Sequence, residues 1–262
     1  MPDMKNTTKA FLRRAAPWLS IAFWLLCWLL LALAFDKPLL LPTPLAVVRK
    51  LGELAMTARF WQMLGLSLLR IAAGIAAAIA VGALLAALTV RFSLAHHLFS
   101  PLLSLLKSTP VASVIFLLLL FMGRNTVPLF IAFAMALPIV WSNLREGLLQ
   151  ADKKLFEMAT VFAVPRTKQL TGILLPETRP YFMAACRAAI SLAWKAGVAA
   201  EVLAVPEHSI GRAIYESRLY LLTEELFAYT LTVIVISALL EQALLCLLTP
   251  TAKKGDDMSC SR

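Results

Sequence analysis

Residues 71–90 read IAAGIAAAIAVGALLAALTV and contain no charged residue. A helix of about 20 apolar residues is long enough to cross the hydrocarbon core of a membrane. Three further stretches, residues 15–35, 108–123 and 125–144, are equally free of charge. The chain is 60% hydrophobic and 15% charged, with a mean hydropathy of +0.80, whereas soluble domains are about half apolar and a quarter charged. The sequence therefore predicts an all-α membrane protein with several spans.

The apolar runs accommodate six transmembrane helices. We expect them near residues 16–35, 62–90, 97–121, 126–146, 179–204 and 226–248. The second is rich in Ala and Gly, which let helix backbones approach closely in lipid, so we expect it to pack against protein on more than one side. Two short helices are expected outside the spans, over residues 45–58 and 207–225.

Lys and Arg are distributed unevenly between the two sets of loops. The N-terminal tail, the turn at Arg91, the region 145–179 and the C-terminal tail hold more of them than the opposite loops. Cytoplasmic loops carry this excess, so we expect both termini in the cytoplasm. The expected organisation is a cytoplasmic tail (1–15), a transmembrane domain (16–248) with a cytoplasmic loop (152–178), and a second cytoplasmic tail (249–262). The net charge of +10 is explained by this orientation, without a nucleic-acid partner.

The loop over residues 152–178 is a polar, proline-punctuated passage between apolar runs. Its apolar residues recur at the spacing of a short amphipathic helix: Leu155, Phe156, Ala159, Phe162 and Ala163. We expect Asp152 as the N-cap of this helix and Pro165 as its end. A second short helix is expected to start after Thr167 and to stop at Pro176. Such a hairpin must dock, either on lipid headgroups or on another protein.

The residues of this loop resemble the signature E-A-A-x3-G-x9-I-x-L-P of ABC importer permeases. Glu157-Met158-Ala159, Ala163 and Ile173-Leu174-Leu175-Pro176 match its spacing throughout. Met158 replaces the middle Ala and Ala163 replaces the Gly, which puts the close backbone contact of the turn in doubt. In that family the loop forms a coupling helix that sits in a groove of the ATP-binding subunit. The resemblance implies coupling to the ATPase through Glu157, Ala159, Phe156, Phe162, Ala163, Ile173 and Pro176.

Other short motifs resemble the nitrate/sulfonate/taurine-type branch of these permeases, over residues 40–248. They are Leu41-Pro42-Thr43-Pro44, Ser67-Leu68-x-Arg70 with Gly74, Pro101-Leu102-Leu103, Ser108-Thr109-Pro110, and Ala193-Trp194 with Ala200-Glu201. Ile210-Gly211-Arg212 keeps only part of the G-L-G element of the branch.

The resemblance implies the type I ABC importer permease fold, with six transmembrane helices and a cytoplasmic coupling helix. It implies a bacterial inner-membrane protein that forms a homodimer, binds two copies of an ATP-binding subunit and receives a small solute from an extracytoplasmic substrate-binding protein. The resemblance also implies that the solute is a sulfonate-, nitrate- or taurine-like anion or a vitamin precursor. It implies that ATP and Mg are bound by the partner subunit, so we expect no cofactor in this chain.

Catalytic and metal-binding motifs are absent from the sequence. There is no G-x4-G-K-[ST] phosphate loop, no Gly-Lys dipeptide and no C-x-x-C pair. His96, His97 and His208 lack a carboxylate at metal-ligand spacing. A membrane enzyme is therefore disfavoured, and we expect no metal site. An ATPase-independent secondary transporter or channel remains the alternative function, although the two halves of the chain show no inverted repeat.

Charged residues inside the expected spans are candidates for the pathway or a gate. A charge at mid-bilayer costs about 2.5–3.5 kcal/mol on insertion scales, so it usually faces protein or water. Arg187, Trp194 and Glu201 lie near one line of the fifth span, although Arg187 is close enough to the inner end to snorkel. For Glu201 and Lys195 both a pathway role and structural pairing remain open, and Glu201 has Lys107 or Lys195 as candidate partners. The pathway or gate candidates are Glu201, Lys195, Trp194 and Lys107.

Overall fold

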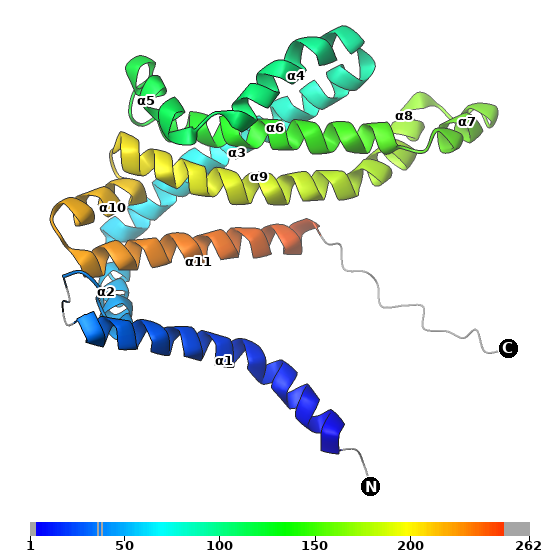
Figure 1. Cartoon of the computed structure of the whole chain (residues 1–262). Coiled ribbons are helices and arrows are strands. Elements are labelled where there is room, and N and C mark those ends of the chain that lie inside the picture. The colour runs from blue at the N-terminus through cyan, green and yellow to red at the C-terminus, as the bar shows by residue number, and fades with distance from the viewer. Residues whose placement is uncertain (1–3, 36, 38, 249–262) are drawn as a thin grey trace. The chain divides into compact units, whose positions relative to one another are not determined.

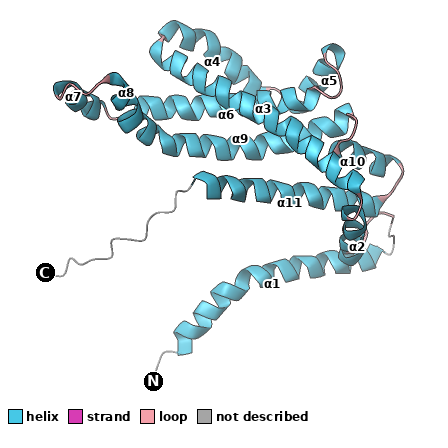
Figure 2. Ribbon diagram, turned by 180° about the vertical axis from the view of Figure 1, so that it is seen from behind, coloured by secondary structure: helices cyan, strands magenta, loops and turns pink. Residues whose placement is uncertain are grey.

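The computed structural model describes residues 4–35, 37 and 39–248, and every regular element among them is a helix (Figures 1 and 2). The expected tail 249–262 lies outside the described residues, as do the side chains of residues 4–18, 153 and 244–248. The elements are α1 (Met4–Phe35), α2 (Pro44–Ala55), α3 (Ala58–Arg91), α4 (Ser93–Ser108), α5 (Val111–Phe121), α6 (Val127–Gln150), α7 (Lys153–Val161), α8 (Arg166–Gln169), the π-helical turn η1 (Leu170–Leu174), α9 (Leu175–Ala204), α10 (Ile210–Leu219) and α11 (Thr223–Leu248).

Four described helices are long and apolar enough to cross a membrane. They are α3, α6, the continuous run Arg166–Ala204 and the part of α11 over Thr223–Ala243. The pair α4 and α5 meets the same criterion only when taken together, which gives up to five spans by length and composition. The part of α1 whose side chains are described, Leu19–Phe35, is apolar but shorter. Because α1 begins at Met4, most of the expected tail over residues 1–15 is helical.

The expected span over residues 97–121 is not one continuous helix. α4 and α5 are bent by 108° at their junction. Proline disfavours the helical conformation at the residue before it, and Thr109, which precedes Pro110, is extended at φ −79° and ψ 132°. The hydroxyls of Ser108 and Thr109 donate to the Leu105 carbonyl at 3.1 and 2.6 Å, which satisfies a carbonyl in the last turn of α4.

The chain divides into two compact units, Met1–Gln62 with Ala213–Thr232 and Met63–Arg212 with Val233–Arg262. In the first unit Trp28 of α1 stacks on Phe227 of α11, with ring centroids 5.8 Å apart. Thr43 caps α2 because its Oγ1 accepts a hydrogen bond from the backbone N–H of Ala46 at 3.3 Å. The helices expected over residues 45–58 and 207–225 are confirmed as the shorter α2 and α10.

In the second unit α6 and α9 pack along each other. Together with α5 they form a buried apolar cluster made of Ile115, Val127, Ile131, Ala134, Met135, Ala196, Ala200 and Ala204. α3 approaches α6 so closely at Gly74 that a Cβ there would overlap the Leu129 carbonyl oxygen. The Ile71 side chain of α3 also lies against Gly197 of α9. Ile71 and Gly74 lie one turn apart on the same face of α3, whereas Leu69 and Leu84 on the opposite face are exposed. Within the described residues one face of this helix is therefore covered, and packing on more than one side stays a prediction.

The polar passage over residues 152–178 is helical, but its boundaries differ from those expected. α7 ends at Val161, before Pro165, and Pro165 itself precedes α8. Pro176 does not stop the second helix, because α8, η1 and α9 form one continuous helical run. A proline ring inside a helix clashes with the carbonyl of the preceding turn, and here that preceding turn is the wider π turn η1. The second arm of the expected hairpin is therefore the first part of the span.

Candidate functional site

The segment between α6 and α9 begins with the nine-residue helix α7. Asp152 caps it as expected, since its Oδ1 accepts a hydrogen bond from the backbone N–H of Lys154 at 2.8 Å. The backbone N–H of Asp152 in turn donates to Oε2 of Glu177, in the first turn of α9, at 2.8 Å. The start of α7 is thus attached to the spanning helix. Sequence reasoning missed Glu177, because a side-chain contact across 25 residues leaves no spacing signal.

The apolar side chains of α7 and its C-cap divide between two faces. Ala159 is buried and Phe156 is half-buried. Met158, Val161 and Phe162 are exposed, Val161 to 82% and Phe162 to 74%. The expected stripe is therefore divided, since Phe156 faces inward and Phe162 outward. We call Met158, Val161 and Phe162 the exposed face of α7. A cluster of large apolar side chains left uncovered usually marks an interaction surface.

The turn after α7 holds Ala163 in the left-handed region, at φ 51°. The N–H of Ala163 donates to Thr160 O at 3.0 Å, and the N–H of Val164 donates to Ala159 O at 2.8 Å. The left-handed conformation costs an L-residue roughly 1–2 kcal/mol, and glycine avoids this cost. Ala163 is the position at which the resembling family has Gly, so the chain keeps the turn at the expense of backbone strain.

The remaining residues expected in coupling lie at different depths. Glu157 is exposed on α7, Ile173 is half-buried in η1, and Pro176 is exposed in the first turn of α9. Pro176 also lines a cavity of about 680 Å³ together with Ala83 of α3 and Leu144 of α6. The structure thus brings Glu157 and Phe162 together on one short helix and places Ile173 and Pro176 at the start of the span.

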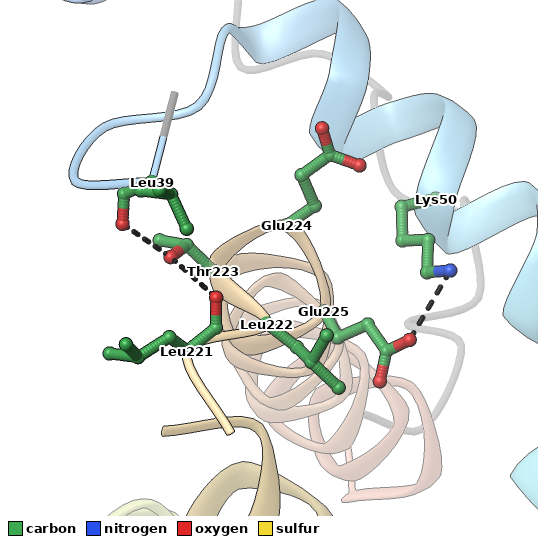
Figure 3. A pocket seen from close by; sticks show the side chains of 7 residues that line it. All are labelled: Leu39, Lys50, Leu221, Leu222, Thr223, Glu224 and Glu225. Carbon is green, nitrogen blue, oxygen red and sulfur yellow. Dashed lines mark hydrogen bonds and ion pairs between the residues drawn. The ribbon is translucent and has the colours of Figure 1, made fainter. Parts of the chain in front are cut away.

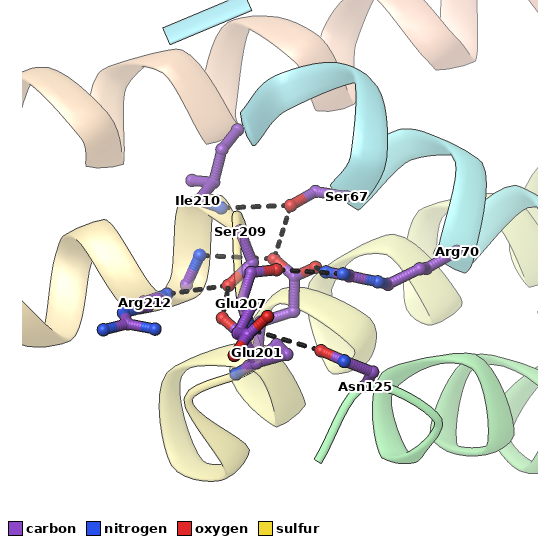
Figure 4. Close-up of polar contacts among 10 residues, drawn as sticks. Ser67, Arg70, Asn125, Glu201, Glu207, Ser209, Ile210 and Arg212 are labelled. Atoms are coloured by element: carbon purple, nitrogen blue, oxygen red, sulfur yellow. Dashed lines mark hydrogen bonds and ion pairs between the residues drawn. The ribbon is translucent and has the colours of Figure 1, made fainter. Parts of the chain in front are cut away.

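At the other end of α9 the Glu201 carboxylate is fully buried (Figure 4). Its Oε2 accepts hydrogen bonds from Ser67 Oγ at 2.7 Å and from the backbone N–H of Gly211 at 3.2 Å. Its Oε1 lies 3.8 Å from Nη1 of Arg70. A buried charge is costly unless it is paired and hydrogen-bonded. These partners, supplied by α3 and the first turn of α10, are what allow a carboxylate at this position.

The same polar side chains hold the connection between α9 and α10. Ser67 Oγ accepts a hydrogen bond from the backbone N–H of Ile210 at 3.0 Å. Arg70 Nη2 donates to the backbone carbonyl of Glu207 at 2.9 Å, and Asn125 Oδ1 accepts from the backbone N–H of Glu207 at 3.1 Å. The contacts all end on backbone groups, so they determine the path of the chain itself (Figure 4).

The backbone of this connection is strained. Val205 and His208 both lie in the left-handed region, at φ 51° and φ 50°. For a β-branched residue such as Val205 this conformation is a genuine outlier. A Cβ at position 211 would overlap Glu201, so only Gly211 allows the first turn of α10 to approach the carboxylate.

The structure changes the expected partners of Glu201. Lys107 and Lys195 are exposed, and neither contacts Glu201 among the described residues. Arg70 is the cation beside it, and this contact was missed although the Ser-Leu-x-Arg and Ala-Glu motifs that contain the two residues were recognised. Neither candidate lysine is therefore paired with Glu201 among the described residues, because α3 places Arg70 next to it.

The other residues singled out in the fifth span have separate surroundings. Trp194 is 1% exposed, and its Nε1 donates to the backbone carbonyl of Val233 in α11 at 3.2 Å. Arg187 is exposed. Although Arg187, Trp194 and Glu201 lie near one line of α9, the structure therefore gives them different environments.

The first unit contains a cavity of about 240 Å³ beside the start of α11 (Figure 3). Lys50 of α2 lies 3.2 Å from Glu225 Oε1, and Thr223 Oγ1 donates to Leu39 O at 2.6 Å. The Glu225 carboxylate raises the pKa of Lys50. The cavity is smaller than the roughly 300–1,000 Å³ of ligand sites, so we interpret these contacts as fixing α2 against α11. Across the part of the chain that the structure describes, no group of three or more His, Cys, Asp or Glu could hold a metal ion.

Comparison with known proteins identifies one family, and the matched residues include the whole of α9. Residues 74–247 match the family model described as "Binding-protein-dependent transport system inner membrane component". The chain is 29% identical over 191 residues (72% of this chain, 68% of the relative) to the putative aliphatic sulfonates transport permease protein SsuC of Bacillus subtilis. It is 26% identical over 224 residues (83% and 81%) to the taurine transport system permease protein TauC of Escherichia coli. It is 29% identical over 159 residues (60% and 57%) to the bicarbonate transport system permease protein CmpB of Synechococcus elongatus.

Proposed function

The chain belongs to the binding-protein-dependent transport inner membrane components, as a permease of the sulfonate/nitrate/taurine branch of ABC importers, and we propose that α7 is its coupling helix. The chain is a non-catalytic, multi-pass translocation subunit of the inner membrane, and a partner ATPase handles ATP and Mg. The observation that carries the proposal is the exposed face of α7, which Met158, Val161 and Phe162 leave uncovered.

The way in which α7 is attached supports a mechanical role. The Asp152–Glu177 hydrogen bond joins its start to α9, and the continuous helical run from Arg166 to Ala204 leads from the segment into the span. A displacement of α7 is therefore passed to a helix that reaches the far end of the unit, through contiguous rigid elements. An interfacial hairpin resting on lipid would not need this attachment.

The residues of the segment then have distinct roles. Phe162, with Met158 and Val161, enters a groove of the ATP-binding subunit, and the exposed Glu157 accepts charge-assisted hydrogen bonds there. Phe156 and Ala159 pack inward and keep α7 in place. Ala163 forms the turn, while Ile173 and Pro176 belong to the π turn and the start of the span.

For the topology we propose six spans, formed by α1, α3, the bent pair α4–α5, α6, α9 and α11. The excess of Lys and Arg then places both termini and the coupling loop over residues 152–178 in the cytoplasm. The transmembrane domain covers residues 16–248, and the cytoplasmic tails are residues 1–15 and 249–262. The complex contains two copies of the permease as a homodimer, two ATP-binding subunits and an extracytoplasmic substrate-binding protein, as the family implies.

For the solute we propose a small sulfonate-, nitrate- or taurine-like anion. The relatives are named for aliphatic sulfonates, taurine and bicarbonate, and two cations, Lys107 of α4 and Lys195 of α9, are exposed within apolar helices. Lys195 is the sequence neighbour of Ala196, a residue of the apolar cluster, and Lys107 is the neighbour of Leu106, which packs against that cluster. We assign Lys107 and Lys195 to the pathway, whereas Glu201 belongs to a gate and Trp194 supports it by packing.

ATP hydrolysis by defined mixtures tests the function. The purified chain in lipid vesicles should hydrolyse no ATP above background, and hydrolysis should appear when its ATP-binding subunit is added. The control is the same complex with the phosphate-loop lysine of the ATP-binding subunit replaced, which removes the contact to the β- and γ-phosphates. Solute uptake by the isolated chain without ATP would instead support the secondary transporter or channel.

A further inference from the structure

The five residues that join α9 to α10, Val205–Ser209, have a shape that their own sequence does not favour. Val205 and His208 are left-handed and neither is glycine. Such conformations persist only where surrounding contacts impose them, and they are concentrated at switch regions and functional sites. The loop is therefore held in a conformation that it would tend to leave if the contacts were released.

The contacts that impose this shape come from outside the loop. Ser67 and Arg70 of α3, Asn125 before α6, and Glu201 of α9 each bond a backbone group between positions 207 and 211. Because these partners lie on separate helical segments, a relative movement of those segments must break or stretch the bonds. The loop can keep its present shape only while α3 and the end of α9 keep their present spacing.

One contact in this set is incomplete. The Arg70 Nη1 and Glu201 Oε1 atoms are 3.8 Å apart, beyond hydrogen-bonding distance, and both are buried without a hydrogen-bond partner among the described residues. The other carboxylate oxygen, Oε2, accepts two hydrogen bonds. A small shift of α3 along α9 is enough to close the pair or to open it, so the pair is the part of the network that responds most readily to helix movement.

We propose that Ser67, Arg70 and Glu201 form a latch that holds the Val205–Ser209 loop closed, and that the Arg70–Glu201 pair opens when the loop moves during transport. This inference rests on the proposed function and refines it. Ser67, Arg70 and Glu201 are positioning residues that act on backbone groups of the connection and not on the solute. Because the bonds of the latch are made within the protein and not to the solute, the latch itself does not select one solute over another.

A reversible cross-link tests whether the loop has to move. Asn125→Cys and Glu207→Cys are introduced into a chain in which the native cysteines are replaced, namely Cys27, Cys186, Cys246 and Cys260. The complex with the ATP-binding subunit is reconstituted in vesicles, and the two thiols are joined by a short, reducible methanethiosulfonate cross-linker. We expect ATP hydrolysis to fall about tenfold when the cross-link is present and to recover on reduction, because conformational steps limit many turnover rates. The single-cysteine variants are the controls.

Thiol labelling then tests the latch itself. A cysteine at the exposed position His208 is labelled with a polar maleimide in the resting complex and in the complex trapped with ATP and vanadate, and we expect a change in rate of about threefold or more. The double variant Arg70→Met/Glu201→Gln leaves no unpaired buried charge. In its resting complex, the cysteine at position 208 should already react as fast as it does in the parent complex trapped with ATP and vanadate. A control cysteine at Arg91, at the opposite end of α3, should keep one rate in both complexes.

The outcomes separate this inference from the function on which it rests. A complex that hydrolyses ATP equally fast when cross-linked and when reduced would overturn the latch and leave the permease function intact. So would a double variant that labels at the resting rate of the parent. A chain that retains no ATP-binding subunit would overturn the proposed function and the latch together.

Discussion

The two ends of α9 are built in opposite ways. At its start, the α7 segment leaves Met158, Val161 and Phe162 exposed and is attached to α9 by a hydrogen bond from the backbone N–H of Asp152 to Glu177. At its end, Glu201 is fully buried and bonded to α3 and to the first turn of α10. Within the part of the chain that the structure describes, the exposed face of α7 is left uncovered, whereas Glu201 is bonded to several groups.

This difference indicates that the two ends of α9 depend on different kinds of contact. Covering exposed apolar side chains lowers the free energy, which is why we propose that a second protein docks on the α7 segment at the start of α9. A buried ion pair adds little net stability compared with an apolar pair but is costly to break from one side. The end of α9 therefore responds sharply to any change in its internal partners. Substitutions at the two ends should accordingly affect different measurements.

The largest effect is expected at the buried end. Arg70→Met leaves the Glu201 carboxylate buried without its cation, and removal of one partner of a buried pair typically costs about 3–5 kcal/mol. The double variant Arg70→Met/Glu201→Gln should recover most of this loss, because a glutamine at position 201 still accepts from Ser67 and Gly211. Thermal unfolding of the detergent-solubilised complex measures both variants.

The matched control is Arg187→Met, which removes an exposed cation from α9, the helix that carries Glu201, and should change the free energy of unfolding by less than about 0.5 kcal/mol. Equal stability of Arg70→Met and the parent would show that the two charges do not depend on each other. The difference between the two ends would then have to be explained by packing alone.

One local feature near the start of α9 was predictable from the sequence. Asp152 acts as an N-cap through a bond to the residue two positions later, and such short-range patterns are visible in a single sequence. The boundary at Pro176 was predicted wrongly, because a proline does not always end a helix: Pro101 and Pro138 also lie inside helices, and at Pro176 the preceding turn is the wider π turn η1. Whether the turn before Pro176 widens depends on the packing around η1 and not on the Leu175-Pro176 dipeptide alone.

The partner of Glu201 could not be predicted from spacing. Arg70 and Glu201 lie on different helices, and their contact depends on how α3 crosses α6 and α9, which is determined by approaches such as that of Gly74 to Leu129. The two motifs that contain Arg70 and Glu201 were visible in the sequence, but nothing in either motif states that they meet. Lys107 and Lys195 were chosen as candidates only because they carry the opposite charge within the apolar runs.

An intermediate effect is expected at the exposed end, on binding and not on folding. Phe162→Ala should weaken binding of the ATP-binding subunit by about 2 kcal/mol, or roughly thirtyfold, as is typical for truncation of an aromatic anchor at an interface. The stability of the permease itself should not change, because Phe162 is 74% exposed. Phe156→Ala is the matched control, since this half-buried ring should lower stability instead. A titration with the purified ATP-binding subunit and thermal unfolding separate the two effects.

If Phe162→Ala binds the ATP-binding subunit as tightly as the parent does, the exposed face of α7 is not the docking surface. Glu157→Ala then becomes the informative variant, because loss of a charge-assisted hydrogen bond should still weaken binding if α7 docks through its polar side. Full retention by both variants would favour an interfacial hairpin that rests on lipid.

The smallest effect concerns the turn that ends α7. Ala163 is left-handed at φ 51°, and this conformation costs an alanine roughly 1–2 kcal/mol. Ala163→Gly removes this strain, but it adds conformational freedom to the unfolded chain, which costs about 0.5–1 kcal/mol of stability. The net effect should be to stabilise the turn by about 0.5–1 kcal/mol. Ala159→Gly, in the helical and buried part of α7, should lose about 1 kcal/mol. Amide hydrogen exchange at Val164, whose N–H bonds to Ala159 O, reports both variants, and slower exchange in Ala159→Gly than in Ala163→Gly would contradict the assignment of strain to this turn.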